Sequence, residues 1–275
     1  MSITFSVITD ELAPDPAVGI AFAVERGLDR VDVRSVGGVN FLSLGRDEQS
    51  RVARQIRDAG LSVGCLATPI LKWTAPGQSA TNAGDQFGFD AKGRSDAEIY
   101  ADAVAAAELL GTRHLRIFSY LIYPGFKMMD LEPPLTALLA LAERHDMVLH
   151  VENEPVCNVK TVPDLTQLLK AWNHPRLKGL LDIGNAASAG APATVQDVAD
   201  VMPWVDQVHF KDYSKAAKRI VATGEGDIPY PELLAPCRAA AATRDLVWTI
   251  ETHVPSDQPG ATERSLAAVR RLAKG

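Results

Sequence analysis

Four apolar stretches of the chain each lead into a side chain that can bind a metal ion. Glu152 follows VLHV, Asp182 closes LKGLLD, His209 lies near the end of VDQVHF, and Glu251 follows LVWTI. A carboxylate that is buried without a counter-charge is unstable in its ionised form, so such placements require a cation nearby. We therefore predict that the four side chains bind one divalent ion. Three carboxylates and one imidazole suit Mn²⁺, Mg²⁺ or Co²⁺, with Zn²⁺ as a further option.

The elements that position these side chains alternate regularly along the 275 residues. β-Branched runs predict strands at 3–9, 30–34, 61–67, 113–118, 147–153, 177–183, 205–211 and 246–252. Helical periodicity predicts helices at 16–26, 46–59, 95–110, 131–145, 161–172, 194–202, 230–243 and 261–273. Eight strand–helix units of this length predict an α/β fold, a (β/α)8 TIM barrel, as a single domain over residues 1–275. A doubly wound sheet is the alternative, but no GxGxxG follows the first strand.

In such a barrel the carboxyl ends of the strands meet at one mouth, where the four ligands would converge. Because side chains alternate along a strand, His150 and Gln207 would face inward below the ligands and hydrogen-bond to them. Glu154, two residues beyond Glu152, would lie in the same supporting layer or at the rim. Lys211 and His253 would lie just above the ligands, where a substrate would bind.

Other side chains near the predicted mouth have two interpretations each. Arg34 and Arg116, near the ends of the second and fourth strands, bind an oxygen-rich substrate or close the rim by pairing with carboxylates. Trp73 lies in the long connection 69–94 and stacks on a sugar ring or fills the core of its own loop. That connection, and a second at 212–229, follow strand ends and are expected to form a lid, a binding loop or a contact between subunits.

The composition limits the classes of partner. Lys and Arg number 28 against 34 Asp and Glu, a net charge of −6, which argues against nucleic acid or an anionic membrane as the main partner. Three scattered cysteines without a CxxC pair favour reduced thiols in a cytoplasmic protein. The N-terminus lacks the pattern of a signal peptide, and no apolar run approaches the roughly 20 residues of a membrane span.

The series Glu152, Asp182, His209 and Glu251, together with VHFKD and GEGDIPY, resembles the xylose-isomerase-like sugar isomerase/epimerase superfamily over essentially the whole chain. The resemblance implies that these four residues bind one ion, commonly Mn²⁺, and that Glu152 and Glu251 also serve as acid and base. It implies that Glu225, within GEGDIPY, lies near the substrate, and that the protein forms dimers or tetramers. One departure is Asn185, which stands where many members have a histidine that touches substrate or metal.

The resemblance implies isomerisation or epimerisation of a keto sugar or keto-polyol through a cis-enediolate. A lyase or hydratase acting on a 3-keto sugar or keto-glycoside through the same enediolate is the alternative. An inactive sugar-binding barrel is a third interpretation. An apurinic-site endonuclease would require additional histidines at the third and fourth strand ends, where CLATP and RIFSY have none.

Overall fold

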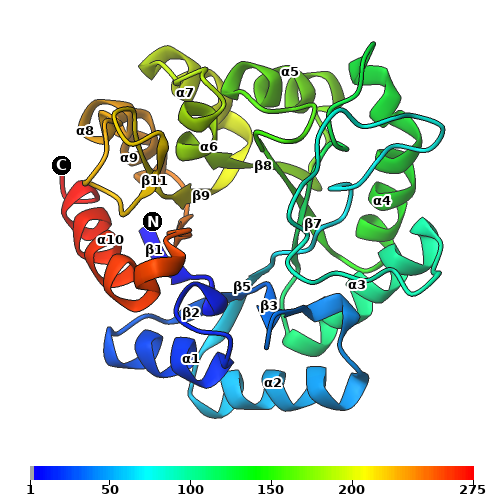
Figure 1. The fold of residues 1–275 in the computed structure, drawn as a ribbon, viewed down its shortest axis with the longest axis horizontal. Coiled ribbons are helices and arrows are strands. Elements are labelled where there is room, and N and C mark those ends of the chain that lie inside the picture. The colour runs from blue at the N-terminus through cyan, green and yellow to red at the C-terminus, as the bar shows by residue number, and fades with distance from the viewer. Residues whose placement is uncertain (1–2) are drawn as a thin grey trace.

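The computed structural model describes residues 3–275, and its central feature is a ring of eight parallel strands. The strands are β1 (Ile3–Val7), β2 (Arg30–Val33), β5 (Ser62–Leu66), β6 (His114–Ile117), β7 (Val148–Glu152), β8 (Leu177–Asp182), β9 (Val205–Phe210) and β12 (Leu246–Ile250). Their order is β1-β12-β9-β8-β7-β6-β5-β2, and a parallel bridge from Ile8 to Asp32 brings the first and last strands together. The predicted TIM barrel is therefore confirmed (Figure 1).

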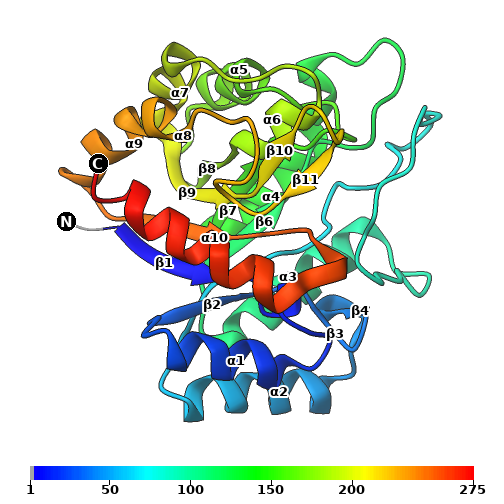
Figure 2. The same ribbon diagram turned by 60° about the vertical axis from the view of Figure 1, so that its left-hand side comes forward.

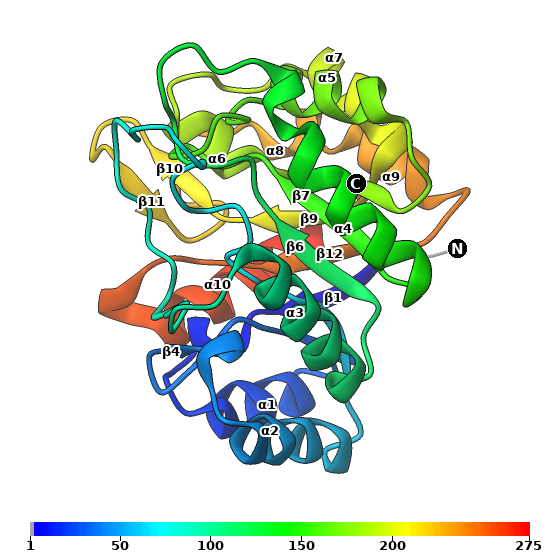
Figure 3. The same ribbon diagram turned by 90° about the vertical axis from the view of Figure 1, so that its right-hand side faces the viewer.

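Helices surround this ring, as Figure 1 shows. They are α1 (Pro16–Glu25), α2 (Arg46–Asp58), α3 (Asp96–Leu110), α4 (Glu132–Arg144), α5 (Val162–Trp172), α6 (Ile183–Ser188), α7 (Val195–Val201), α8 (Tyr230–Leu233), α9 (Ala235–Ala241) and α10 (Gln258–Leu272). Short 3₁₀ helices lie at Thr9–Glu11, Phe41–Ser43, Met128–Leu131, Met202–Trp204 and Pro255–Asp257. Figure 3 shows α3 and α4 covering the side of the barrel that contains β6 and β7.

One predicted helix differs from the structure, and one helix of the structure was not predicted. The predicted helix 230–243 is divided into α8 and α9 at Leu234, because Pro236 has no N–H to continue the hydrogen bonding of the first segment. Helix α6 was not predicted, since six residues are too few to show a helical period. It begins directly from the end of β8, where the Asp182 side chain accepts a hydrogen bond from the backbone N–H of Asn185.

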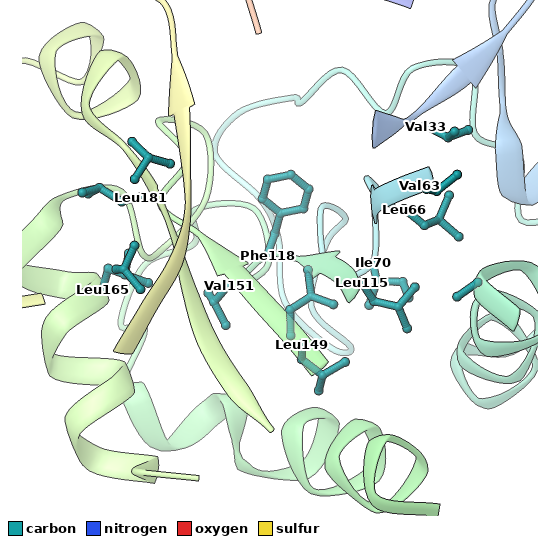
Figure 4. Packing of buried hydrophobic residues seen from close by; sticks show 14 of the residues in the cluster. Val33, Val63, Leu66, Ile70, Leu115, Phe118, Leu149, Val151, Leu165 and Leu181 are labelled. Carbon is teal, nitrogen blue, oxygen red and sulfur yellow. The ribbon is translucent and has the colours of Figure 1, made fainter. Parts of the chain in front are cut away.

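The apolar core lies between the barrel and the helices. On β7, Leu149 and Val151 point into this layer and are fully buried, as are Leu115 of β6 and Leu165 of α5 (Figure 4). Alternation along β7 turns His150 and Glu152 to the other face, the inside of the barrel. The inside of the barrel is consequently free to hold polar side chains.

The segments that follow strand ends gather at one end of the barrel. They include two antiparallel ribbons, β3 (Ser35–Val36) with β4 (Val39–Asn40) and β10 (Asp212–Ser214) with β11 (Arg219–Val221). In Figure 2 the long connection between β5 and α3 projects on the right, the side on which β4 and β11 also lie. These segments surround the mouth toward which the ligand-bearing strands point.

The loop GEGDIPY is built around the buried carboxylate of Asp212. That carboxylate accepts backbone N–H groups from Gly224 at 2.9 Å and Ile228 at 3.2 Å. A Cβ atom at Gly226 would lie 2.2 Å from Asp212 Oδ1, so only glycine permits this approach. The expected position of Glu225 near the substrate is not observed, because its carboxylate points outward and pairs with Arg264 at 2.5 Å. The role of the motif in the structure is to wrap around Asp212.

We predict that Gly226→Ala destabilises the protein by about 1–3 kcal/mol, because the added methyl group must displace Asp212 from its backbone donors. Denaturant unfolding measures the loss. The control is Gly45→Ala, where nothing lies within 4 Å of the added Cβ and the cost should stay below about 1 kcal/mol. Equal effects of the two substitutions would contradict this account of the loop.

Candidate metal centre and active site

The four predicted ligands come together at the mouth of the barrel. One ligand atom from each of Glu152, Asp182, His209 and Glu251 lies within 4.8 Å of all the others, and all four residues are buried. His209 Nδ1 is 3.4 Å from Glu152 Oε1 and 3.2 Å from Glu251 Oε2. Asp182 pairs in register with His209 across β8 and β9, so the strand alignment itself brings these two side chains together.

Two buried cations each touch two of these carboxylates. Arg116 Nη1 lies 3.1 Å from Glu152 Oε2 and 3.4 Å from Glu251 Oε1. Lys211 Nζ lies 2.8 Å from Asp182 Oδ2 and 2.6 Å from Glu251 Oε2. The chain itself thus provides part of the counter-charge that the cluster requires.

Burial and the neighbouring charges raise the pKa of some members of the cluster and lower the pKa of others. Burial raises the pKa of Asp182 to about 6, although Lys211 opposes the shift. Burial would also raise the pKa of Glu152, but Arg116 and His209 together outweigh it and lower the pKa to about 2. Burial would lower the pKa of His209, but Glu251 and Glu152 outweigh it and raise the pKa to about 9. Lys211, His253 and His209 overcome burial and hold the pKa of Glu251 well below its usual range.

Asparagine side chains fix the orientation of the ligands. Asn153 donates to the backbone carbonyl of Asp182 at 2.7 Å and accepts its N–H at 2.9 Å, which ties β7 to β8. Asn185 donates to Asn153 O at 3.0 Å and to Glu152 Oε1 at 3.3 Å, and its Oδ1 accepts from Lys211 at 3.2 Å. Asn185 therefore connects Glu152 to Lys211.

The layer beneath the ligands agrees only in part with the prediction. Gln207 Nε2 donates to Asp32 at 2.6 Å and lies 3.5 Å from His209 Nε2, so it supports the imidazole. His150 instead contacts His114, with 2.9 Å between their ring nitrogens, and burial lowers the pKa of His150 well below its usual value. The expected contact between His150 and a ligand is absent from the hydrogen bonds of residues 3–275.

A cavity of about 500 Å³ lies next to the cluster, and none of the four ligands is part of its lining. Asn185, which contacts Glu152, and Arg34, which contacts Glu251, separate the cluster from the cavity. Its lining includes four of the residues predicted near the substrate or rim: Arg34, Glu154, Asn185 and His253. The rest of its lining is Asp10, Glu11, Lys72, Asp85, Phe87, Val156, Val254, Pro255 and Gln258.

Four residues predicted to bind substrate are not part of this lining. Arg116 and Lys211 lie below it against the carboxylates, with 1% exposure each, and Glu225 points to the surface. Trp73 stacks on Phe89, with ring centroids 6.0 Å apart, and so belongs to the core of its own loop. The aromatic ring at the cavity is that of Phe87, 3.9 Å from Arg34 Cζ and 5.9 Å from the His253 ring.

Several lining residues were not identified from the sequence. Asp10 and Glu11 follow the first strand, and their acidic pair was the one signal that could have been used. Lys72 and Phe87 lie in the connection between β5 and α3, whose sequence has no period from which to place a side chain.

The residues present fit a divalent ion at the quartet. Glu152 Oε2 and Asp182 Oδ2 are buried and form no hydrogen bond within the described chain, beyond their ion-pair contacts with Arg116 and Lys211. Hard oxygen ligands with one imidazole match Mn²⁺, Mg²⁺ or Zn²⁺ chemistry.

A second set of potential metal ligands lies close together in the structure and consists of Glu11, Glu251 and His253. This set surrounds an arginine side chain. Arg34 lies 2.6 Å from Glu11, 3.0 Å from Glu251 and 2.9 Å from His253 Nε2. The guanidinium is therefore the cation of that group.

The parallel barrel and a carboxylate–histidine quartet at its mouth define the class of protein. A profile of the family described as xylose isomerase-like TIM barrel matches residues 20–272, and the chain belongs to this family. None of the helices in residues 3–275 has the length and hydropathy needed to cross a membrane.

Comparisons with individual proteins show more distant similarity. A 3-dehydroshikimate dehydratase of Bacillus anthracis is 33% identical over 76 residues, which are 28% of this chain and 27% of that protein. The structure of the IOLI protein with a bound zinc atom is similar over 100% of this chain and 98% of that one, with a TM-score of 0.74 and 13% identity. An L-ribulose 3-epimerase structure is similar over 100% and 95%, with a TM-score of 0.73 and 15% identity. At these identities the structural matches show the fold.

We predict that the metal-free protein binds about one Mn²⁺ per chain, and that Glu152→Gln and Glu251→Gln each weaken binding by more than about 100-fold. Each substitution removes one anionic ligand while keeping the size of the side chain. Equilibrium dialysis with metal analysis measures the affinity. Glu225→Gln is the control, because Glu225 faces Arg264 at the surface. Binding that is indifferent to both ligand substitutions would refute the metal centre.

Metal affinity should also depend on pH, because the ion must displace the proton of His209. The raised pKa values of about 9 for His209 and about 6 for Asp182 set the range. Affinity should rise about tenfold per pH unit between these values, more steeply below the lower one, and level off above the higher one. Chelator competition from pH 5 to 10 measures the profile; a profile that is flat from the lower to the higher pKa would contradict it.

Proposed function

We propose that this protein is a divalent-metal-dependent isomerase or epimerase that moves a proton on the carbon next to the carbonyl of a keto sugar or keto-polyol. The observation that carries the proposal is the quartet itself, in which Glu152 and Glu251 both contact His209. Glu152 also contacts Asn185, and Glu251 contacts Arg34, and both of these partners line the cavity. The similarity in fold to an L-ribulose 3-epimerase supports this assignment.

When bound, the ion would supply Lewis-acid stabilisation of the negative charge that develops on the substrate oxygens. The proton itself is moved by the glutamates. Glu152 has a lowered pKa and is ionised near neutral pH, the state in which its carboxylate accepts a proton from carbon. Arg116 contacts both glutamates, so it balances their charge whichever of the two holds the proton. Glu251 is also ionised at rest, because its pKa lies well below its usual range, so it must first take up a proton from water and then return that proton to the enediolate.

Some of the residues that line the cavity would bind and orient the substrate next to these groups. Asn185 contacts Glu152, and Arg34 contacts Glu251, so each links the cavity to one proposed acid or base. Phe87 covers Arg34 and presents an apolar face, against which a sugar ring can lie. The same surface excludes part of the bulk water from the reacting carbon.

A second candidate function is that of a dehydratase. The segment match to a 3-dehydroshikimate dehydratase favours it. In that reaction Glu152 takes the proton next to the carbonyl, and a hydroxyl group on the following carbon leaves as water after Glu251 protonates it. Both candidates begin with the same proton abstraction.

Further parts of the proposal concern the ion and the assembly. We propose Mn²⁺ as the native ion; the zinc bound in the similar IOLI protein supports Zn²⁺ as an alternative. We also propose a small-molecule substrate, a cytoplasmic homodimer or homotetramer, and one barrel domain over residues 1–275.

The shared step predicts metal-dependent uptake of deuterium from D₂O. Metal-loaded protein is incubated with L-ribulose, D-tagatose or 3-dehydroshikimate, and mass spectrometry after removal of protein and metal detects carbon-bound deuterium. Glu152→Gln and Glu251→Gln, at saturating metal, should each slow uptake by about 10²–10⁴-fold, the usual contribution of a general acid or base.

Glu225→Gln again serves as the control and should exchange at the rate of the unaltered protein. Uptake of deuterium without release of water supports the epimerase, whereas conversion of 3-dehydroshikimate with loss of water supports the dehydratase. No metal-dependent uptake into any of the three compounds would refute the proposed step.

A further inference from the structure

Lys72 is a buried ammonium at the cavity whose role the proposed reaction does not explain. It lies in the connection after β5, lines the cavity, and is 4% exposed. Its Nζ lies 5.3 Å from the centre of the Phe87 ring and 4.9 Å from that of Phe118. Aromatic faces attract a cation but do not neutralise it, so a buried ammonium here needs an anionic partner.

Glu154 is that partner. Its Oε2 lies 3.4 Å from Lys72 Nζ, the one ion pair that Lys72 forms within residues 3–275. Glu154 also lines the cavity, and its side chain is 15% exposed. The same oxygen lies 3.5 Å from the amide nitrogen of Asn185. Lys72 and Glu154 therefore form a pair without net charge, with polar atoms that border the cavity.

The other strong cation of the lining is fully engaged. Arg34 donates through Nε to Asp10 at 3.0 Å, through Nη1 to Glu251 at 3.0 Å and through Nη2 to Glu11 at 2.6 Å. The lining contains four carboxylates, those of Asp10, Glu11, Asp85 and Glu154, against the two cations Lys72 and Arg34. Carboxylates therefore outnumber Lys and Arg side chains in the lining, and both of these cations are already paired.

This arrangement selects against an anionic ligand. A phosphate or carboxylate group binds tightly where it meets an unpaired cation, and here it would have to displace a carboxylate first. A hydroxyl group meets no such obstacle, because it can donate to Glu154 and accept from Lys72.

We infer that the Lys72–Glu154 pair determines specificity, by favouring an uncharged polyhydroxy ketone and excluding phosphorylated or carboxylated compounds. The inference rests on the proposed function and narrows it, since it favours a neutral keto sugar over 3-dehydroshikimate. Lys72 and Glu154 contact the substrate in this account and take no part in the proton transfer.

Two variants that remove the same amount of charge separate this role from a general electrostatic effect. Glu154→Gln removes one negative charge and releases Lys72. Asp85→Asn also removes one negative charge from the lining, but Asp85 is exposed and forms no ion pair with Lys72. Its carboxylate accepts the N–H of Phe87 at 2.7 Å, a bond that the amide oxygen of asparagine can keep.

The experiment measures binding of inorganic phosphate, L-ribulose and L-ribulose 5-phosphate to the metal-loaded proteins by calorimetry. Glu154→Gln should bind both phosphate compounds about 10-fold to 100-fold more tightly than the unaltered protein does, the range expected for a new charge-assisted hydrogen bond. Asp85→Asn should change these affinities by less than about threefold, as expected for a screened surface charge. Adding Lys72→Met to Glu154→Gln should abolish the gain.

Two results would overturn the inference. The first is a gain in phosphate affinity in Glu154→Gln that is no larger than the gain in Asp85→Asn. The second is unaltered protein that binds L-ribulose 5-phosphate more tightly than L-ribulose and loses this preference when Lys72 is replaced by Met. These results are distinct from failure of the proposed function. Deuterium uptake into 3-dehydroshikimate but not into neutral ketoses would preserve the proton transfer and overturn the specificity. With no uptake into any compound, the proposed reaction fails, and the phosphate comparison still decides the role of the pair.

Discussion

The burial of three carboxylates at one point is the constraint on which the rest of the structure depends. Glu251 shows it best: its oxygens lie 2.6 Å from Lys211, 3.0 Å from Arg34, 3.2 Å from His209 and 3.4 Å from Arg116. A buried charge of this kind is stable only when its partners are equally fixed, because each unpaired member would cost several kcal/mol. These partners come from β6 and β9 and from the residues that follow β2 and β9, so the closed barrel is what brings them together.

The division of the barrel into an apolar outside and a polar inside follows from this constraint. Strand residues alternate between the two faces, and a parallel sheet covered by helices can bury all of its apolar side chains on the outer face. The inner face then holds hydrogen-bonded pairs such as His114 with His150 and Gln207 with Asp32. The same alternation turns Arg116 and Glu152 to the inside of the barrel, each two residues beyond a member of the histidine pair, so their salt bridge lies one level above that pair.

The features that could be predicted from the sequence are those that depend on strand periodicity. The barrel and the convergence of Glu152, Asp182, His209 and Glu251 follow from where apolar runs end, because parallel strands carry their last residues to the same edge. Contacts made across space could not be predicted in this way. Arg116 and Lys211 have the parity of substrate-binding residues, but the carboxylates beside them hold them below the cavity.

Loop residues were the least predictable, for a related reason. Trp73 and Phe87 lie in the same connection, and no period indicates which ring faces the cavity; packing against Phe89 decides it for Trp73. Glu225 was expected at the site because the motif GEGDIPY resembles that of the family. In the structure, Asp212 holds this motif through backbone N–H groups, and the side chain of Glu225 points outward to Arg264.

Asn185 shows how a single replacement fits the charge network. Its amide nitrogen has two protons and donates to both Asn153 O and Glu152, while its oxygen accepts from Lys211. A neutral imidazole has one donor and one acceptor, so a histidine at this position would leave one of these three groups without its bond. The asparagine is therefore better suited to holding Lys211 and Glu152 in place than to exchanging protons with a substrate. In the proposed reaction, recognition of the substrate would then fall to the cavity lining, which includes Lys72, Glu154 and Phe87.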